Sequence, residues 1–501
     1  MVIYRPGNYS LLLFSLCLAV FLCSPLNSFS KDNWVEITTP NFRIVSNSGE
    51  GQARKLAAQF EQFRQMFHNA FPQFHVDLGK PLLILAVKNE DSLKVLLPAY
   101  WETKGRVHPS GYFMPGEAQH FVALRTDIAG DNPYEVVYHE YTHAIMDLNV
   151  QGLPVWLSEG LAEYFAASVM HEKDVDIGRP LLGRLMDLQR DRLIPIDTLM
   201  LVDARSPYYN EENRASVFYA ESWAIVHYLM LSPEARKRQL LRTFLAAWDS
   251  SGNQLQAAQQ TFGDLKKFAN SMDAYVRQPS FFYTKVPTSA HADAKSFAVR
   301  TISPAEAAAD ESLFLAQTGR MKEAATMANE ALAAEPNLAI AHQAQGEVAY
   351  RNRNIPIAQQ EFTRSIELDS KAYVSYYYAA EARLRAGNTS FQDLPEISGY
   401  LEKALAVNAQ FAPAYSALCT VYSMHPETYD KALSSGRKAI DVEPGNLFYA
   451  TTYGYSLLNM GRTADAKQLA QRINALAKNP QEQHMAAQLS AAAAARESAL
   501  Q

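Results

Sequence analysis

A pattern with a step close to 34 residues runs through the C-terminal part of the chain. Two pairs of alanines, Ala324 with Ala358 and Ala432 with Ala466, are each 34 positions apart. Four related segments recur at steps of 34, 39 and 35 residues, at 330–336, 364–370, 403–409 and 438–444. A repeat of this length is one helix–turn–helix unit, which buries its apolar face only by stacking on its neighbours. The sequence therefore predicts an all-α solenoid over 303–501.

This period resembles that of TPR repeats. Four repeats are clear, a fifth runs from Leu447 to about Leu476, and the step of 39 indicates a short insertion between Asn388 and Pro395. A solenoid needs a cap at its end, and the Ala-rich stretch 484–499 is expected to be that capping helix. TPR arrays usually bind peptide or protein segments in their concave groove. The resemblance therefore implies a protein partner in this groove.

Two short motifs in the middle of the chain indicate chemistry. The segment HEYTH occupies 139–143, and EGLAE follows at 159–163. Pro133 suits the first turn of a helix, so His139 and His143 are expected to lie inside one. Residues four apart share a helix face, so both imidazoles can point at one zinc ion. Glu140 directly follows the first histidine and is placed to take a proton from the attacking water.

A third ligand is expected from a second helix that opens near Pro154 or Ser158. Glu159 and Glu163, four apart, would share one face of this helix. The stretch 149–154 contains the glycine and proline needed to turn the chain back, which would bring Glu159 to the open side of the two histidines. Asp147, four residues after His143, is a rival for the third position.

The combination of HExxH with W-x-x-E-G-x-A-E resembles the gluzincin metallopeptidases, and most closely the peptidase-MA-like bacterial proteins. The resemblance implies that Zn²⁺ is the cofactor and that His139, His143 and Glu159 are its ligands. It also implies that Glu140 is the catalytic base and that Glu163 orients a histidine from behind. An ordinary surface charge is the alternative for Glu163.

The predicted fold class is α+β, with a gluzincin-like domain followed by the TPR solenoid. Residues 31–285 form the first domain, in which a small mixed sheet with helices over 31–130 precedes a helical part over 131–285. Residues 286–302 have the composition of a linker. In gluzincins an edge strand before the HExxH helix holds the substrate backbone by strand addition. The resemblance assigns that strand to 111–114 or 120–124.

The candidate oxyanion donor is Tyr219, sixty residues after Glu159, since a tyrosine at a comparable place serves related enzymes. His227 is the alternative donor, and a plain core helix in which Tyr219 is an ordinary aromatic is another. Aminopeptidase-N-like members carry G-x-M-E-N on their edge strand, and 111–115 reads GYFMP. The mismatch favours an endopeptidase, or an enzyme with a narrow protein substrate, over an exopeptidase.

The first thirty residues resemble a secretory signal. Arg5 precedes the apolar stretch 11–23, and small residues at 28 and 30 suit cleavage. The stretch is short for a membrane span, so we expect an exported, periplasmic bacterial protein with no span after cleavage; an uncleaved anchor is the alternative. The net charge of −6 gives no reason to expect nucleic acid. Beyond this stretch Cys419 is the one remaining cysteine, which excludes a disulfide framework.

Two functions from different classes follow. The first is an exported zinc-dependent metallopeptidase that cleaves a protein substrate, with the TPR domain recruiting that substrate or a partner. The alternative is a non-catalytic TPR adaptor that carries a vestigial peptidase domain. The presence of all four motif residues, His139, Glu140, His143 and Glu159, favours the enzyme. A zinc hydrolase of cell-wall peptide is compatible with export, but nothing in the sequence selects it.

Overall fold

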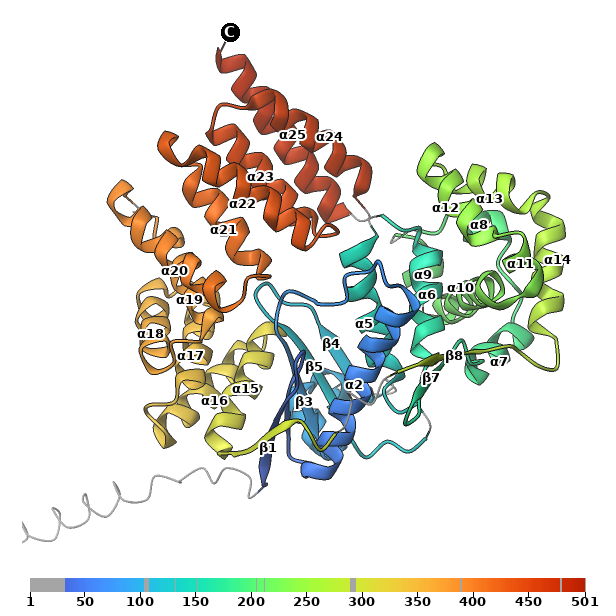
Figure 1. Ribbon diagram of the computed structural model, residues 1–501, viewed down its shortest axis with the longest axis horizontal. Coiled ribbons are helices and arrows are strands. Elements are labelled where there is room, and N and C mark those ends of the chain that lie inside the picture. The colour runs from blue at the N-terminus through green and yellow to red at the C-terminus, as the bar shows by residue number, and fades with distance from the viewer. Residues whose placement is uncertain are drawn as a thin grey trace, which may run out of the picture.

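The structure is a computed structural model (Figure 1). It describes residues 32–102, 108–130, 132–150, 152–203, 205–210, 212–288, 294–387, 390–477 and 480–500. The predicted signal segment lies outside the described residues. The protein is mostly helical and contains a small mixed sheet and a TPR-like solenoid, as the sequence predicts. None of the helices in the described part is long and apolar enough to cross a membrane.

The main sheet has six strands in the order β4-β5-β3-β2-β1-β9. Its strands are β1 (Trp34–Thr38), β2 (Arg43–Ser46), β3 (Leu82–Val87), β4 (Gly111–Met114), β5 (His120–Arg125) and β9 (Ala298–Ile302). β3 pairs in parallel with β2 and β5, and the other pairs are antiparallel. Every residue of β3 is buried, as expected for a central strand covered on both faces. β4 stands at one end of the strand order and is an edge strand.

The two faces of this sheet are covered by different parts of the chain. Ile84 and alternate neighbours pack on the long helix α2 (Glu50–Ala70), which buries Phe60 and Phe63. Leu83 and its alternate neighbours pack against Phe314, which belongs to the first solenoid helix. The remaining helices of this region are α3 (Glu90–Leu96) and α4 (Ala99–Glu102). The solenoid thus begins as a layer of the sheet domain.

The linker predicted at 286–302 is wrong over its second half. Residues 298–302 form β9, which pairs with β1 along its whole length. Residues 284–287 form β8, which belongs to a second sheet. The linker prediction relied on the composition of 287–292. It neglected the following segment, in which Phe297 and Ile302 are buried.

The region that begins with the two motifs and ends before the solenoid is helical, as predicted, and also contains a three-stranded sheet. That sheet is β6 (Val169–Met170), β7 (Asp174–Ile177) and β8 (Thr284–Pro287). The helices are α5 (Glu135–Asn149), α6 (Val155–Ala166), α7 (Leu182–Arg190), α8 (Ile196–Leu199), α9 (Pro207–Asn210), α10 (Glu212–Leu231), α11 (Pro233–Lys237), α12 (Leu240–Ser251), α13 (Gln254–Phe262) and α14 (Leu265–Val276).

Five helix pairs and a final helix form the solenoid. They are α15 (Pro304–Gln317) with α16 (Met321–Ala334), α17 (Ala339–Arg351) with α18 (Ile355–Leu368), α19 (Tyr373–Arg385) with α20 (Leu394–Val407), α21 (Ala412–Tyr422) with α22 (Tyr429–Val442), α23 (Leu447–Asn459) with α24 (Thr463–Leu476), and α25 (Pro480–Leu500). Short 3₁₀ turns, η2 (Phe391–Asp393) and η3 (Pro426–Thr428), precede α20 and α22. The four alanines that set the period are fully buried. Leu489 of α25 packs on Gly454, which fits the predicted cap.

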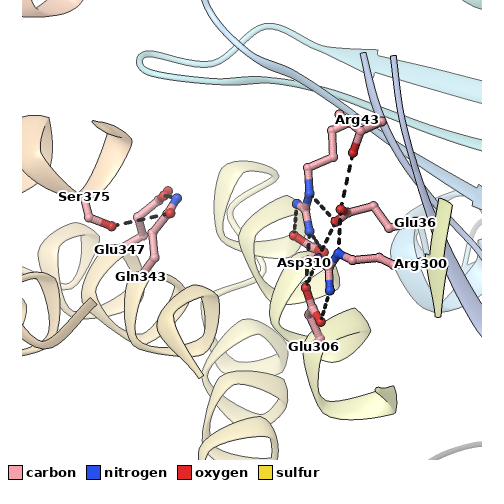
Figure 2. Close-up of polar contacts among 9 residues, drawn as sticks. Glu36, Arg43, Arg300, Glu306, Asp310, Gln343, Glu347 and Ser375 are labelled. Carbon is pink, nitrogen blue, oxygen red and sulfur yellow. Dashed lines mark hydrogen bonds and ion pairs between the residues drawn. The ribbon is translucent and has the colours of Figure 1, made fainter. Parts of the chain in front are cut away.

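An ion-pair network fastens the solenoid to the sheet (Figure 2). The guanidinium of Arg43 on β2 donates to both carboxylate oxygens of Asp310 on α15, at 2.6 and 2.7 Å. Arg43 also donates to Glu36 at 2.7 Å, and Glu36 accepts from Arg300 on β9. Arg300 reaches Glu306 on α15. Asp310 is fully buried, so this contact joins the two domains inside the protein.

A buried carboxyl group gives a prediction about stability. Glu221 on α10 accepts one hydrogen bond, from the backbone N–H of Ile194, and its burial raises the pKa from 4.5 to about 8. The native state therefore keeps a proton that the unfolded chain releases above pH 4.5, and stability falls as the pH rises toward 8. We expect Glu221→Gln to stabilise the protein by about 2 kcal/mol at pH 8 and to change little at pH 5. Urea unfolding at both pH values measures this, and equal effects at both would contradict it.

Candidate metal centre

The two motifs lie on neighbouring helices that form a hairpin. α5 ends at Asn149, whose side chain caps it by donating to the carbonyl of Ile145. Gly152, with a φ of +66°, turns the chain, and α6 begins directly after Pro154, as the sequence predicts. The hairpin places the HExxH face of α5 opposite the first turns of α6.

Close packing fixes the position of α6. A Cβ on Gly160 would lie 2.4 Å from the carbonyl oxygen of Ser222 on α10, so this position has room only for glycine. Trp156 is fully buried and packs edge-on against Phe244. The conspicuous tryptophan and glycine of the second motif thus hold α6 in place, with Glu159 between them in the sequence.

The structure brings His139, His143 and Glu159 together. The Nε2 atoms of the two histidines lie 3.2 Å apart, and each is 3.3 Å from Oε2 of Glu159. Donor atoms bound at about 2.0–2.1 Å to a tetrahedral zinc ion lie about 3.3–3.4 Å from one another. The three atoms therefore already have the spacing of a zinc site with its fourth position open.

The carboxylate of Glu159 also fits a cation. Its Oε1 accepts a hydrogen bond of 2.8 Å from the hydroxyl of Tyr209. Its Oε2 is buried and has no hydrogen-bond partner among the described residues, although it faces both imidazoles. An unsatisfied buried carboxylate oxygen is costly. A cation shared with the two histidines would remove this cost.

Each histidine has a second polar neighbour behind it. Nδ1 of His139 lies 3.4 Å from Glu163 on α6, and Nδ1 of His143 lies 3.3 Å from the hydroxyl of Ser158. Glu163 is buried and accepts two hydrogen bonds, at 2.6 and 2.8 Å, from Arg184 on α7. Partners of this kind set the orientation of a metal-binding imidazole. Glu163 is placed where the family resemblance put it.

The charges of the cluster are strongly coupled. Burial works against charge on His139, but the neighbouring carboxylates of Glu159 and Glu163 outweigh it and raise the pKa of His139 to about 10. Burial likewise opposes charge on Glu159, but the neighbouring imidazoles of His139 and His143 hold its pKa well below the ordinary value. These opposite shifts favour a proton shared between the imidazole and the carboxylates. A metal ion must displace that proton when it binds.

Two tyrosines border the cluster. Tyr209 on α9 binds Glu159 and shares a hydrogen bond with Tyr219 on α10. The Tyr219 ring lies edge-on to His139, with centroids 6.2 Å apart, and the guanidinium of Arg184 lies 5.5 Å from its centre. Burial and the nearby Glu159 raise the pKa of the Tyr219 phenol. Tyr219 therefore keeps its proton and can donate it in a hydrogen bond.

The alternative oxyanion donor, His227, is excluded by its position. It is fully buried, with Nδ1 2.7 Å from the Tyr275 hydroxyl and Nε2 2.8 Å from the carbonyl of Gly178. Burial lowers its pKa to about 4, so it stays neutral. His227 belongs to the aromatic core beside Trp223. Asp147, the rival ligand, is outside the group of converging donor atoms, which contains Glu159.

A cleft of about 470 Å³ opens beside the cluster. Glu140 and His143 line it from α5, and Phe113 of the edge strand β4 and His120 of β5 line the adjoining wall. α5 approaches β4 closely, because Gly111 leaves room for Val137. Of the two strands that the family resemblance proposed for substrate pairing, β4 is the free edge. β5 is paired on both sides.

A second group of possible ligands carries its own cation. His171, Asp174 and Asp176 have donor atoms within 4.8 Å of one another. Lys285 lies 3.3 Å from Asp174 and 3.1 Å from Asp176, and His171 pairs with Asp176 at 3.1 Å. The lysine thus offsets the charge that would attract a metal ion.

Sequence reasoning missed Arg184, Ser158 as a partner of His143, and Tyr209. A tyrosine that donates to a metal-binding carboxylate fixes that carboxylate, and loss of such a partner typically lowers metal affinity 10–100-fold. We expect Tyr209→Phe to weaken zinc binding by about this factor, whereas Tyr219→Phe leaves it nearly unchanged. Competition with a chromogenic chelator measures both. Equal losses in the two variants would contradict the assignment.

Comparisons with known proteins give two results. The family described as "Protein of unknown function (DUF1570)" matches residues 135–246, a stretch that contains all six predicted site residues. No curated protein matches the chain. Among solved structures, TTC0263, a thermophilic TPR protein in Thermus thermophilus, is 20% identical, covers 37% of this chain and 98% of its own, and has a TM-score of 0.32.

Two further structures match similarly. YrrB, a TPR protein with an unusual peptide-binding site, is 14% identical over 35% of this chain and 88% of its own, with a TM-score of 0.29. The yeast Tom70 is 13% identical over 73% of this chain and 82% of its own, with a TM-score of 0.31. The TPR-like description rests on the repeated helix pairs, and the cluster of His139, His143 and Glu159 lies within the stretch that matches DUF1570.

Proposed function

We propose that the protein is a zinc-dependent metallopeptidase that cleaves peptide bonds within a protein substrate. The observation that carries the proposal is the triangle of donor atoms on His139, His143 and Glu159, with sides of 3.2 to 3.3 Å. The unsatisfied Oε2 of Glu159 supports a cation at its centre. Two imidazoles and one carboxylate are a ligand set of catalytic zinc sites, which keep a position open for water.

The neighbouring side chains suit peptide hydrolysis. When bound, zinc would lower the pKa of a water molecule toward about 7 and polarise the scissile carbonyl. Glu140 lines the cleft beside His143 and would take the proton of the attacking water, then pass it to the leaving amine. The Tyr219 hydroxyl would donate to the developing oxyanion. The free edge of β4 would hold the substrate backbone by strand addition.

A protein-interaction scaffold is the second candidate function. The TPR-like helix pairs favour it, since such repeats typically bind protein or peptide segments. For this part of the chain the two functions agree, because a TPR-like array would recruit a protein in both. They differ in whether the metal cluster is active. We further propose export to the periplasm, on the basis of the signal-like residues 1–30.

Zinc content is the first test. The purified full chain is expected to hold about one zinc per molecule by elemental analysis after dialysis, and His143→Ala is expected to lose it. His171→Ala is the matched control. It removes a histidine from the second group of possible ligands, His171, Asp174 and Asp176, and should keep the metal. Zinc that persists in His143→Ala would place the metal elsewhere. Absence of zinc from every variant, after refolding with added metal, would leave the scaffold function.

A further inference from the structure

The solenoid carries a second hollow next to the cleft of the metal cluster. It has a volume of about 680 Å³ and lies on the inner helices α19, α21 and α23. Two large apolar side chains, Met424 and Phe448, line it and are 45% and 53% exposed. Exposed apolar side chains gathered in a hollow are typical of a binding site. We refer to it as the solenoid hollow.

The solenoid hollow and the cleft adjoin each other. Lys80, Gly116, Asn446 and Phe448 line both. The far wall of the cleft is itself made of solenoid residues, at the start of α23 and of α25, including Leu447 and Met485. Figure 1 shows the array leaving the sheet at α15 and arching back toward α5. The metal cluster thus faces a space that both domains enclose.

Fixed contacts hold the two domains in this arrangement. Lys80 pairs with Glu443 at 3.1 Å, and both side chains are buried. The side chain of Asn408 donates to the carbonyl of Gly79 at 3.0 Å. A Cβ on Gly445 would lie 1.9 Å from the carbonyl oxygen of Asp147, so the solenoid touches α5 itself. The C-terminal half of the solenoid is therefore packed against the domain that contains His139, His143 and Glu159.

The edge strand points from one hollow to the other. β4 ends at Met114, and Pro115 and Gly116 continue from it into the cleft wall. Gly116 and the next residue, Glu117, then line the solenoid hollow. A peptide strand paired with β4 extends by about 3.3 Å per residue. Beyond Met114 such a strand would lie next to Pro115 and Gly116, which border the two hollows.

The charge of the solenoid hollow favours a basic side chain. Glu117 is exposed and accepts one hydrogen bond, of 2.8 Å, from the hydroxyl of Tyr377. No ion pair within 4.0 Å joins it to a cation among the described residues, although Arg351 lies close enough for the two charges to interact. Glu381 lies on the same wall, and its nearest cation, Arg385, is 4.0 Å away and stacks on Tyr350. The hollow's other cation, Lys80, is already paired with Glu443.

A third carboxylate lies behind this wall. Glu347 is buried and accepts from Gln343 at 3.1 Å, and Gln343 accepts from Ser375 at 3.5 Å (Figure 2). Burial raises the pKa of Glu347 and of Glu381 to about 7, and the charge of Glu117 adds to both shifts. A positive charge placed beside Glu117 would reduce this repulsion.

We propose that the cleft and the solenoid hollow form one binding site for an unfolded polypeptide. The chain pairs with β4 beside the metal cluster, continues past Gly116, and lays an apolar side chain on Phe448 and a basic one beside Glu117. The proposal rests on the proposed peptidase function, since it names the substrate class of the same site. The solenoid then positions the bond to be cleaved as well as recruiting the substrate.

Binding of labelled peptides to the full-length Glu140→Gln protein tests this site without cleavage. A peptide of about 16 residues with one central lysine spans roughly 50 Å when extended, and one of about six residues spans roughly 20 Å. Fluorescence anisotropy should show that Phe448→Ala and Met424→Ala each weaken binding of the long peptide by at least about fivefold. Phe391→Ala is the matched control, because this phenylalanine is 60% exposed and lines neither hollow.

Charge gives an independent readout. Replacing the central lysine by glutamate should weaken binding of the long peptide about tenfold, and Glu117→Gln should remove most of this preference. Tyr377→Phe removes the hydrogen bond and keeps the carboxylate, so the preference should persist. If the protein that keeps Glu117 binds the lysine and glutamate forms of the long peptide equally well, the charge assignment is overturned.

The outcomes separate this inference from the peptidase proposal. Phe448→Ala and Met424→Ala should also be made in the chain that keeps Glu140. If these variants hold zinc and cleave the protein substrate at the parent rate, the inference is overturned and the peptidase proposal stands. Long-peptide binding that depends on both residues, in a protein that neither holds zinc nor cleaves, would remove the peptidase proposal and keep the joint site. Loss of binding in Phe391→Ala as well would indicate a general effect on the solenoid and overturn the site.

Discussion

Glu140→Gln is expected to lower the rate of cleavage of an unfolded protein by about 10²–10⁴-fold and to leave the zinc content unchanged. Glu140 lines the cleft next to His143 but is not among the three converging donor atoms. The amide keeps the shape of the side chain and loses its ability to take a proton. Rates should be measured with and without a zinc chelator, alongside elemental analysis of the same sample.

A control variant shows whether the loss of activity comes from removing the base or would follow the removal of any carboxylate. Glu234→Gln changes a glutamate on the surface of α11, where it is 65% exposed, and should cleave at the rate of the parent. His143→Ala should lose both zinc and activity. If Glu140→Gln holds zinc and still cleaves at the parent rate, Glu140 is not the base, and the mechanism proposed above is wrong.

The parts of the site that the sequence predicts are those set by one helix or one hairpin. The spacing of His139 and His143 fixes a common face of α5, because a helix brings residues four apart together. Glu159 follows across a short turn, so few chain conformations can separate it from α5. The structure confirms that these three side chains converge. Whether they hold zinc stays a prediction.

The supporting residues depend on long-range packing and carry no local signal. Arg184 reaches Glu163 from α7, and Tyr209 reaches Glu159 from the four-residue helix α9, fifty positions along the chain. Nothing in the residues around either one indicates a partner. His227 shows the reverse problem, because its type suits catalysis and only the fold shows that it lies in the core.

Domain organisation could be predicted only in part, for a similar reason. The repeat period specifies the helix pairs, since each pair is local in sequence. It contains no information on where the array docks, so the covering of the sheet by α15 and of the cleft by α23 could not be foreseen. The linker error has the same origin: β9 is a strand because β1 offers it a free edge.

Asp310→Ala is expected to lower the free energy of unfolding by about 3 kcal/mol. Asp310 is fully buried and accepts two hydrogen bonds from Arg43, so its removal leaves a guanidinium without its main partner inside the domain junction. Arg43 keeps Glu36, and its side chain is 29% exposed, which places the cost at the lower end of the range for a broken buried pair. Urea unfolding followed by tryptophan fluorescence and by circular dichroism measures it.

Glu306→Ala is the matched control from the same network. Glu306 pairs closely with Arg300, whose side chain is 50% exposed, and only distantly, at 4.0 Å, with Arg43; a half-exposed pair contributes about 0–1 kcal/mol. If the junction depends on the buried pair, Asp310→Ala should also separate the unfolding of the sheet domain from that of the solenoid, whereas Glu306→Ala keeps one transition. Similar small losses in both variants would mean that the apolar contacts of Phe314 with the sheet hold the junction, with the ion pairs adding little.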